Sequence, residues 1–211
     1  MNNKRFISFE GLYYSGKSTQ IKLLTDYLEG QGQRVYAMRE PGGTAISEKI
    51  REILLDKNNM NMTDRCEIFL YSAARVQLVQ ERIIPLLDKG YFVIADRYVD
   101  STTAYQGYGR QLDLNMVQSI NQAATFGLLP GKTFYLRLLP EQVYLRSPQS
   151  GRDLDRLEAA GLEFYRRVFQ GYEKIVENNP QRFVVIDANL SIEQIHQRIV
   201  EVVKKTALGN S

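Results

Sequence analysis

One stretch decides the fold of this 211-residue chain: Gly11-Leu12-Tyr13-Tyr14-Ser15-Gly16-Lys17-Ser18-Thr19. It follows an apolar run at residues 5–9, and helix-forming residues come directly after it. The pattern G-x-x-x-x-G-K-[ST] between a strand and a helix is that of a phosphate-binding P-loop. Backbone N–H groups of such a loop and of the helix N-terminus point at an anion. The stretch therefore predicts an ATP site; the alternative is a plain strand–turn–helix with an exposed lysine.

Each residue type in this loop has a chemical purpose. Gly11 and Gly16 allow backbone dihedrals and close approaches that a Cβ atom blocks. Lys17 supplies a point charge for the β- and γ-phosphates, and the Ser18 hydroxyl is a ligand for Mg²⁺. We therefore expect all nine residues, Gly11 to Thr19, to contact ATP.

Short apolar runs alternate with segments of helical period along the whole chain. The runs are residues 5–9, 34–38, 91–95, 132–136 and 183–186. Strands that are apolar on both faces are typical of a parallel sheet covered by helices on both sides. No linker or repeat interrupts the chain, so residues 1–211 are expected to form one three-layer α/β domain with a five-stranded parallel sheet.

Two helices are indicated by spacings of three and four. The first carries Cys66, Phe69, Ala73, Val76 and Gln80, a stripe expected to face the core, with Cys66 as a small core hydrophobe. The second carries Ile192, Ile195, Ile199 and Val202. Ser191 and Gln194 are predicted to form a capping box that opens this second helix.

The composition excludes several classes of protein. Lys and Arg number 27 against 24 Asp and Glu, a net charge of +3, which is too balanced for a dedicated nucleic-acid or membrane-surface binder. A single cysteine cannot form an internal disulfide, which favours a reducing, cytoplasmic location. We expect neither a membrane span nor a signal peptide, because no apolar run is long enough and residues 1–10 lack an apolar core. No His/Cys cluster suggests a structural metal.

A second landmark is the run at 91–95, which ends in Asp96-Arg97-Tyr98. In open α/β sheets, ligands gather at the carboxyl ends of strands. Asp96 can hold Mg²⁺ beside Ser18, and Arg97 can contact a phosphate through two donors. The alternative is an Asp–Arg surface pair, which contributes little energy.

Several motifs in order resemble the thymidylate kinase (dTMP kinase) family of bacterial type, from Phe6 to about Val203. They are Arg39-Glu40-Pro41-Gly42-Gly43-Thr44, Ile50-Arg51-Glu52-Ile53-Leu54-Leu55, Asp96-Arg97-Tyr98, Asp100-Ser101, Ala104-Tyr105-Gln106-Gly107, Gly109-Arg110, Gly127-Leu128-x-Pro130 and Asp155-Arg156-x-Glu158. The resemblance implies a P-loop nucleoside monophosphate kinase fold with a short lid. It also implies Mg²⁺-dependent transfer of the ATP γ-phosphate to dTMP, a step of dTTP biosynthesis, by a homodimer.

The resemblance also assigns roles to residues. Arg39 and Arg97 are similar to a pair that holds the acceptor phosphate. Tyr71 lies where the family has an aromatic residue stacked on thymine, and Arg75 where an arginine contacts a base carbonyl; four residues apart, they share one helix face. The expected acceptor site is completed by Glu10, Pro41, Ser101, Tyr105 and Gln106.

The lid implied by the resemblance is residues 146–156, with Arg146, Arg152 and Arg156. Bacterial members without an arginine in the P-loop supply the catalytic positive charge from this lid. Tyr14 stands at that P-loop position here. We therefore expect Arg146 to contact ATP, and Lys17, Arg97, Arg152 and Arg156 to be catalytic.

The P-loop departs from the family pattern at Tyr13-Tyr14-Ser15. The family has an acidic residue at the position of Tyr13, and a phenol carries no charge at pH 7. Two alternatives to a dTMP kinase follow: a kinase of the same fold with another nucleotide acceptor, and a nucleotide-binding homologue with impaired catalysis.

Overall fold

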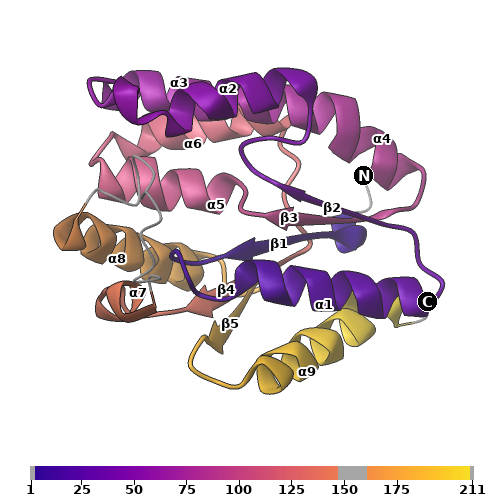
Figure 1. The fold of residues 1–211 in the computed structure, drawn as a ribbon. Helices are drawn as coiled ribbons and strands as arrows, with labels where there is room; N and C mark the ends of the chain where they lie inside the picture. Colours follow the sequence, from indigo (N-terminus) through magenta and orange to yellow (C-terminus); the bar gives the residue numbers. More distant parts are fainter. Residues whose placement is uncertain (1–2, 147–160, 210–211) are drawn as a thin grey trace.

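The structure, a computed structural model, describes residues 3–146 and 161–209. Within these residues the chain forms a parallel sheet of five strands in the order β2-β3-β1-β4-β5, with helices on both sides (Figure 1). The strands are β1 Phe6–Glu10, β2 Val35–Arg39, β3 Phe92–Asp96, β4 Lys132–Arg137 and β5 Phe183–Asp187. Each predicted strand is confirmed to within one residue at either end, as is the three-layer α/β architecture.

The helices connect the strands in chain order. The α-helices are α1 Lys17–Gly30, α2 Ala45–Leu55, α3 Asp64–Leu78, α4 Ile84–Asp88, α5 Val99–Thr102, α6 Leu114–Thr125, α7 Pro140–Arg146, α8 Leu162–Asn178 and α9 Ile192–Val203. Short 3-10 turns (η1 Asn3–Arg5, η2 Lys57–Asn59) and π-helical turns (η3 Val79–Ile83, η4 Thr103–Gly109, η6 Lys204–Leu208) extend or link them. No helix in the described part of the chain combines the length and the apolar character that crossing a membrane requires.

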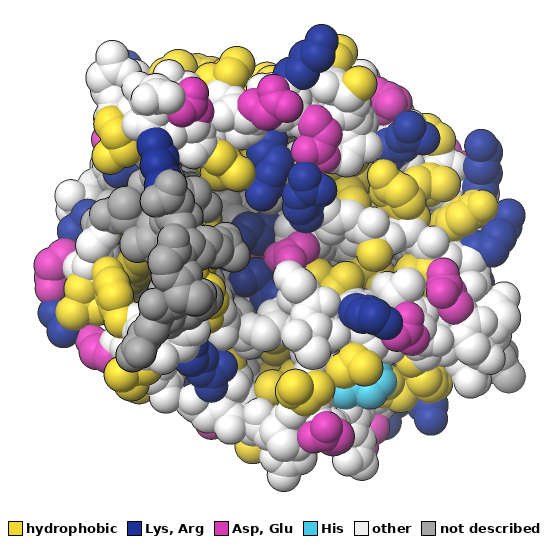
Figure 2. Space-filling model, viewed as in Figure 1, with side chains coloured by type: hydrophobic (Ala, Val, Ile, Leu, Met, Phe, Trp, Pro, Cys, Tyr) yellow, Lys and Arg dark blue, Asp and Glu magenta, His cyan; other side chains and the backbone are white. Residues whose placement is uncertain are grey.

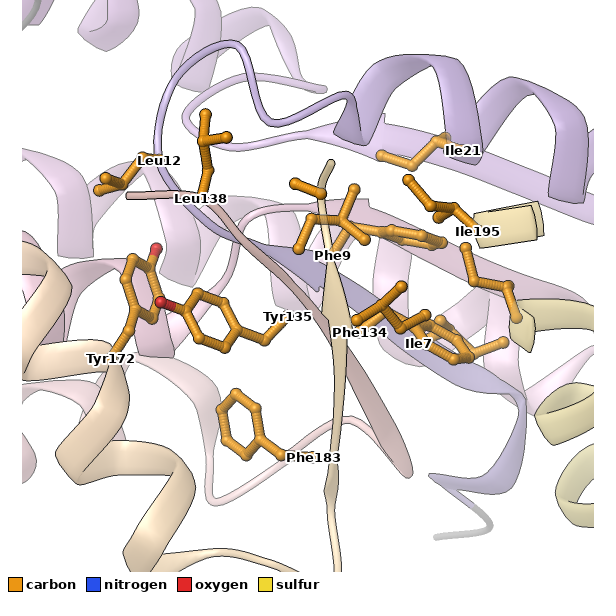
Figure 3. Packing of buried hydrophobic residues seen from close by; sticks show 14 of the residues in the cluster. Ile7, Phe9, Leu12, Ile21, Phe134, Tyr135, Leu138, Tyr172, Phe183 and Ile195 are labelled. Carbon is orange, nitrogen blue, oxygen red and sulfur yellow. The ribbon is translucent and has the colours of Figure 1, made fainter. Parts of the chain in front are cut away.

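The central strands β1, β3 and β4 are buried on both faces, whereas the edge strands β2 and β5 are only partly buried. Ile7 and Phe9 of β1 pack in one cluster with residues of α1 and α9, whereas Phe6 packs in the other with residues of α3 and η3. Figure 3 shows Phe9 beside Ile21 and Ile195 in the first cluster. This two-sided burial accounts for the near-continuous apolar character that the strands show in the sequence.

The predicted core face of α3 was wrong. Cys66 and Phe69 are exposed, Phe69 by 57%, and the buried positions of α3 include the polar residues Glu67, Ser72 and Arg75. The face that α3 turns inward is partly polar because it borders the cavity described below. The capping box of Ser191 and Gln194 at the start of α9 is confirmed.

Each of the five strands ends with a charged residue at one edge of the sheet, and the three neighbours β2, β3 and β1 end with Arg39, Asp96 and Glu10. The strand order changes direction at β1, which lies between β3 and β4. Ligands of open α/β sheets bind at such a switch point, outside the carboxyl ends of the strands.

Candidate active site

A cavity of about 530 Å³ opens at this edge of the sheet. Figure 2 shows Lys and Arg side chains gathered around a hollow near the centre of this face, with Asp and Glu among them. The predicted site residues that line the cavity are Tyr13, Tyr14, Ser15, Gly16, Lys17, Ser18, Thr19, Arg39, Pro41, Tyr71, Arg75, Asp96, Arg97, Ser101, Tyr105, Gln106 and Arg146. Residues that the sequence places more than 130 positions apart therefore share one space.

The P-loop wraps the start of α1. Gly11 has a φ of 138°, and a Cβ atom there would lie 2.5 Å from the carbonyl oxygen of Leu136, so this position requires glycine. Gly16 caps α1 in the left-handed region, with a φ of 91°. Gly11 and Leu12 do not line the cavity; Leu12 packs in the core.

Lys17 is almost fully buried at the first position of α1. Its ammonium group donates to the carbonyl oxygens of Leu12, at 3.0 Å, and Gly11, at 3.3 Å. Burial, helped by the positive charge of Arg97, lowers the pKa of Lys17 to about 7. The negative charge of a bound anion would raise this pKa and so favour the protonated, charged form of Lys17.

Ser18 and Asp96 meet at the mouth of the cavity. The Ser18 hydroxyl donates to Asp96 Oδ2 at 2.9 Å. Among the residues described, no group of three or more His, Cys, Asp or Glu side chains could hold a metal ion by itself. One hydroxyl and one carboxylate nevertheless fit Mg²⁺, which prefers hard oxygen ligands and takes most of its coordination shell from substrate phosphates and water.

Arg97 lines the floor of the cavity. Its backbone has the left-handed conformation, with a φ of 74°. Its Nη1 donates to Gly11 O at 2.9 Å and to the Ser101 hydroxyl at 3.1 Å. The rings of Tyr13 and Tyr105 each lie 5.0 Å from its guanidinium carbon. No residue of the described chain accepts a hydrogen bond from its Nε or Nη2, so these donors remain for a ligand.

Glu10 lies behind this floor and does not line the cavity. Its carboxylate accepts from the backbone N–H of Tyr98 at 2.7 Å, the Ser101 hydroxyl at 2.6 Å and the Tyr172 hydroxyl at 2.8 Å. Complete burial and the nearby charge of Asp100 raise the pKa of Glu10 to about 7. Glu10 is therefore linked to Arg97 through the hydroxyls of Ser101 and Tyr172, which both accept from Arg97 Nη1.

Tyr71 and Arg75 also line the cavity, and both come from α3. Arg75 is 2% exposed and donates to Glu40 through Nε, at 2.7 Å, and to Asn121 through Nη1, at 3.2 Å. A buried ion pair with a further hydrogen-bond partner holds its side chain in one direction. The guanidinium group is thus fixed at the cavity wall.

Arg39, the other expected ligand of the acceptor phosphate, has a half-exposed side chain. Its Nη2 donates to Glu48 at 2.9 Å, and Glu48 also accepts from the backbone N–H of Gly43, at 2.8 Å. Pro41 lines the cavity too, and its carbonyl oxygen accepts from Arg51. An exposed pair of this kind is weak, so a phosphate can compete for Arg39.

Arg146 ends α7 and donates to the backbone oxygens of Tyr14, at 3.4 Å, and Ala188, at 3.0 Å. It therefore links the P-loop to the loop after β5. Arg152 and Arg156, and nearly all of the expected lid at 146–156, lie outside the described residues.

Four residues that were not predicted as site residues also line the cavity: Glu40, Arg51, Leu55 and Thr102. Glu40 and Arg51 belong to motifs that carry the family resemblance. The adjacent charges of Arg39 and Glu40 could have indicated that Glu40 belongs to the site. Nothing in the sequence shows that Glu40 binds Arg75, 35 positions away.

Comparisons with known proteins agree with this geometry. The family model described as thymidylate kinase matches residues 9–199. A protein named thymidylate kinase from Chlorobaculum tepidum is 50% identical over 202 residues, which cover 92% of this chain and 94% of that protein. Another of that name from Thermoanaerobacter pseudethanolicus is 45% identical over 201 residues, covering 95% and 98%. A third, from Sulfurihydrogenibium, is 44% identical over 203 residues, covering 96% and 98%.

Proposed function

The chain belongs to the thymidylate kinase family, and from that premise we propose how the residues of its cavity bind and activate the two nucleotides. The protein is an enzyme that phosphorylates dTMP with ATP, giving dTDP and ADP. One observation carries the assignment of roles: the P-loop and the pocket of Tyr71 and Arg75 line a single cavity. Phosphoryl transfer requires such a space, because donor and acceptor phosphates must meet in line.

At the donor end, Lys17 exchanges the carbonyl oxygens of Gly11 and Leu12 for the phosphates of ATP. The backbone N–H groups of residues 13–19 and the N-terminus of α1 provide further donors to the phosphates. Ser18 and Asp96 would hold Mg²⁺, which would neutralise negative charge on the ATP phosphates.

At the acceptor end, Arg97 offers Nε and Nη2 to the dTMP phosphate, and Arg39 approaches it from the end of β2. Tyr71 stacks on the base, and Arg75 donates to a base carbonyl. Ser101, Tyr105 and Gln106 surround the sugar and the inner edge of the base. Tyr105 is 3% exposed, and its ring would exclude a ribose 2′-hydroxyl from the acceptor site.

The catalytic charge comes from several directions. Lys17 and Arg97 oppose each other across the reacting phosphates, and neutralise negative charge in the transition state. Arg146 adds positive charge next to Tyr14. We assign the same task to Arg152 and Arg156 on the resemblance alone, with residues 146–156 as the lid of a single domain spanning 1–211.

We also propose that the protein forms a homodimer and is located in the cytoplasm. The support for the dimer is the exposure of large apolar side chains on two helices that pack against each other: Ile46 and Ile53 of α2 and Phe69 of α3 are 52%, 46% and 57% exposed. These two helices lie together at the top of Figure 1. Large exposed apolar faces of this kind mark protein interfaces.

A coupled ADP-release assay with MgATP tests the proposed function. We expect rapid turnover with dTMP, slower turnover with dUMP, and little with purine monophosphates. Family membership does not favour a different acceptor or a protein without catalysis. ADP release with another monophosphate but not with dTMP would contradict the assignment, as would silence in an assay where a known dTMP kinase is active.

A further inference from the structure

The buried carboxylate of Glu67 accepts a hydrogen bond from the side-chain amide of Gln106, which lines the cavity beside Tyr71 and Arg75. Gln106 belongs to η4 and is 2% exposed, and Glu67 belongs to α3 and is fully buried. Gln106 Nε2 donates to Glu67 Oε1 at 2.8 Å. A carboxylate paired with arginine can only accept, so the amide must direct its NH₂ group toward Glu67.

Arg110 fixes the carboxylate in turn. It donates through Nη2 to Glu67 Oε2, at 3.0 Å, and through Nε to Oε1, at 3.3 Å. This contact with both carboxylate oxygens is geometrically restrictive. The guanidinium carbon of Arg110 also lies 5.0 Å from the ring centroid of Phe164, and Asp64 Oδ1 lies 3.4 Å from Arg110 Nε.

The consequence appears on the cavity side of Gln106. The NH₂ group of Gln106 donates to Glu67, so the carbonyl oxygen of the same amide is available as an acceptor. No described residue donates to that oxygen. Gln106 lines the same cavity as Tyr71 and Arg75. The base therefore meets a hydrogen-bond acceptor at Gln106 and a donor at Arg75.

We propose that Glu67 and Arg110 are positioning residues that fix the hydrogen-bonding polarity of Gln106 and thereby select a base with an N3–H group. This inference rests on the proposed function, in which the base lies against Arg75 and Gln106. Thymine and uracil present a carbonyl oxygen beside N3–H, which matches a donor beside an acceptor. Cytosine presents the reverse at both positions, an amino group and an unprotonated N3.

The Glu67→Gln substitution tests the proposal because it changes one atom. Arg110 then holds the new amide by its oxygen, and the new NH₂ group donates to Gln106. Gln106 must turn its own carbonyl toward residue 67 and present NH₂ to the base. The ratio of kcat/KM for dTMP to that for dCMP is expected to fall roughly tenfold or more, without inverting, because Arg75 still rejects cytosine.

Two controls separate this effect from loss of structure. Asp64→Asn removes the other carboxylate beside Arg110, which has no contact with Gln106, and should leave the ratio unchanged. In a Gln106→Leu background, Glu67→Gln should no longer move the ratio. If Glu67→Gln does not fold, Glu67→Asp withdraws the carboxylate from Gln106 while keeping its charge, and it should lower the ratio in the same way.

A dTMP:dCMP ratio that stays within twofold of the wild type in the folded Glu67 variant overturns the proposal, even if turnover with both acceptors falls. That outcome leaves the proposed function intact, because the wild type still phosphorylates dTMP. Failure of the wild type on dTMP would instead refute the proposed function itself.

Discussion

The guanidinium carbon of Arg97 lies 5.0 Å from the ring centroid of Tyr13, on the face of the phenol. Tyr105 faces the same guanidinium at the same distance, 5.0 Å. The Tyr13 ring is itself held edge-on by Tyr105 and Tyr165, each with a centroid distance of 6.3 Å. Tyr13, at the position where the family resemblance predicts an acidic residue, therefore contacts the arginine through its π-system.

This contact predicts that the ring of Tyr13, rather than its hydroxyl, supports catalysis. Tyr13→Leu should lower kcat/KM for dTMP by roughly 5- to 30-fold, since a partly desolvated cation–π contact contributes about 1–2 kcal/mol. Tyr13→Phe keeps the ring and should retain most of the activity. Steady-state kinetics with dTMP as the varied substrate measure both; equal losses in the two variants would show that the ring face is not what matters.

Removal of Lys17 should abolish turnover. Lys17→Ala deletes the charge that the P-loop directs at the phosphates, and it also removes a poorly solvated ammonium group from a buried position. We therefore expect a folded protein, with a melting temperature no lower than that of the wild type, and no measurable ADP release. Full activity in Lys17→Ala would show that the P-loop does not bind the ATP phosphates.

ATP binding should be accompanied by proton uptake at pH 8. The pKa of Lys17 is lowered to about 7 by burial, so its amine is mostly neutral at pH 8 before the ligand binds. Anionic phosphates favour the charged form and raise that pKa, so close to one proton enters per ATP bound. Calorimetric titrations in two buffers of different ionisation enthalpy report the uptake. Identical heats in the two buffers would contradict it.

Stability should depend on pH through Glu10. Its pKa is raised from 4.5 to about 7 in the folded protein, chiefly by burial, so the folded state favours the protonated form. The resulting stabilisation is present below pH 4.5 and is lost as the pH rises to 7. Relative to Glu10→Gln, the free energy of unfolding of the wild type should fall by about 2–3 kcal/mol between pH 5 and pH 8. Urea titrations at the two pH values measure this difference; a constant gap would count against the shifted pKa.

A charge on the apolar face of α2 and α3 should dissociate the proposed homodimer. Phe69 is 57% exposed in the single chain, and Phe69→Glu would place a carboxylate in the interface, where it costs several kcal/mol if unpaired. Sedimentation equilibrium should show a monomer. Val185→Glu is the matched control, since Val185 is 44% exposed but lies on β5, at the opposite edge of the sheet from β2. A dimer that survives Phe69→Glu would place the interface elsewhere.

The accuracy of the sequence predictions varied with the range of the interactions involved. The P-loop and its strand depend on neighbouring residues, so Gly11 to Thr19 could be located from spacing alone. The orientation of α3 could not, because its exposed stripe of Cys66 and Phe69 has the same apolar period as a core-facing one. The packing of α3 against α2 and α6 and its position at the cavity decide which face turns inward.

The sequence by itself determined the succession of strands and helices along the chain, the phosphate-binding loop and the resemblance to thymidylate kinases. These are local patterns of residue type and spacing. The tertiary structure decided which side chains meet. It placed Glu40 on Arg75, Glu67 on Gln106 and Tyr13 on Arg97. Each of these contacts joins residues at least 35 positions apart, and each orients a group that is buried or half-buried. Burial makes such contacts strong and directional, and burial is a property of the folded chain alone.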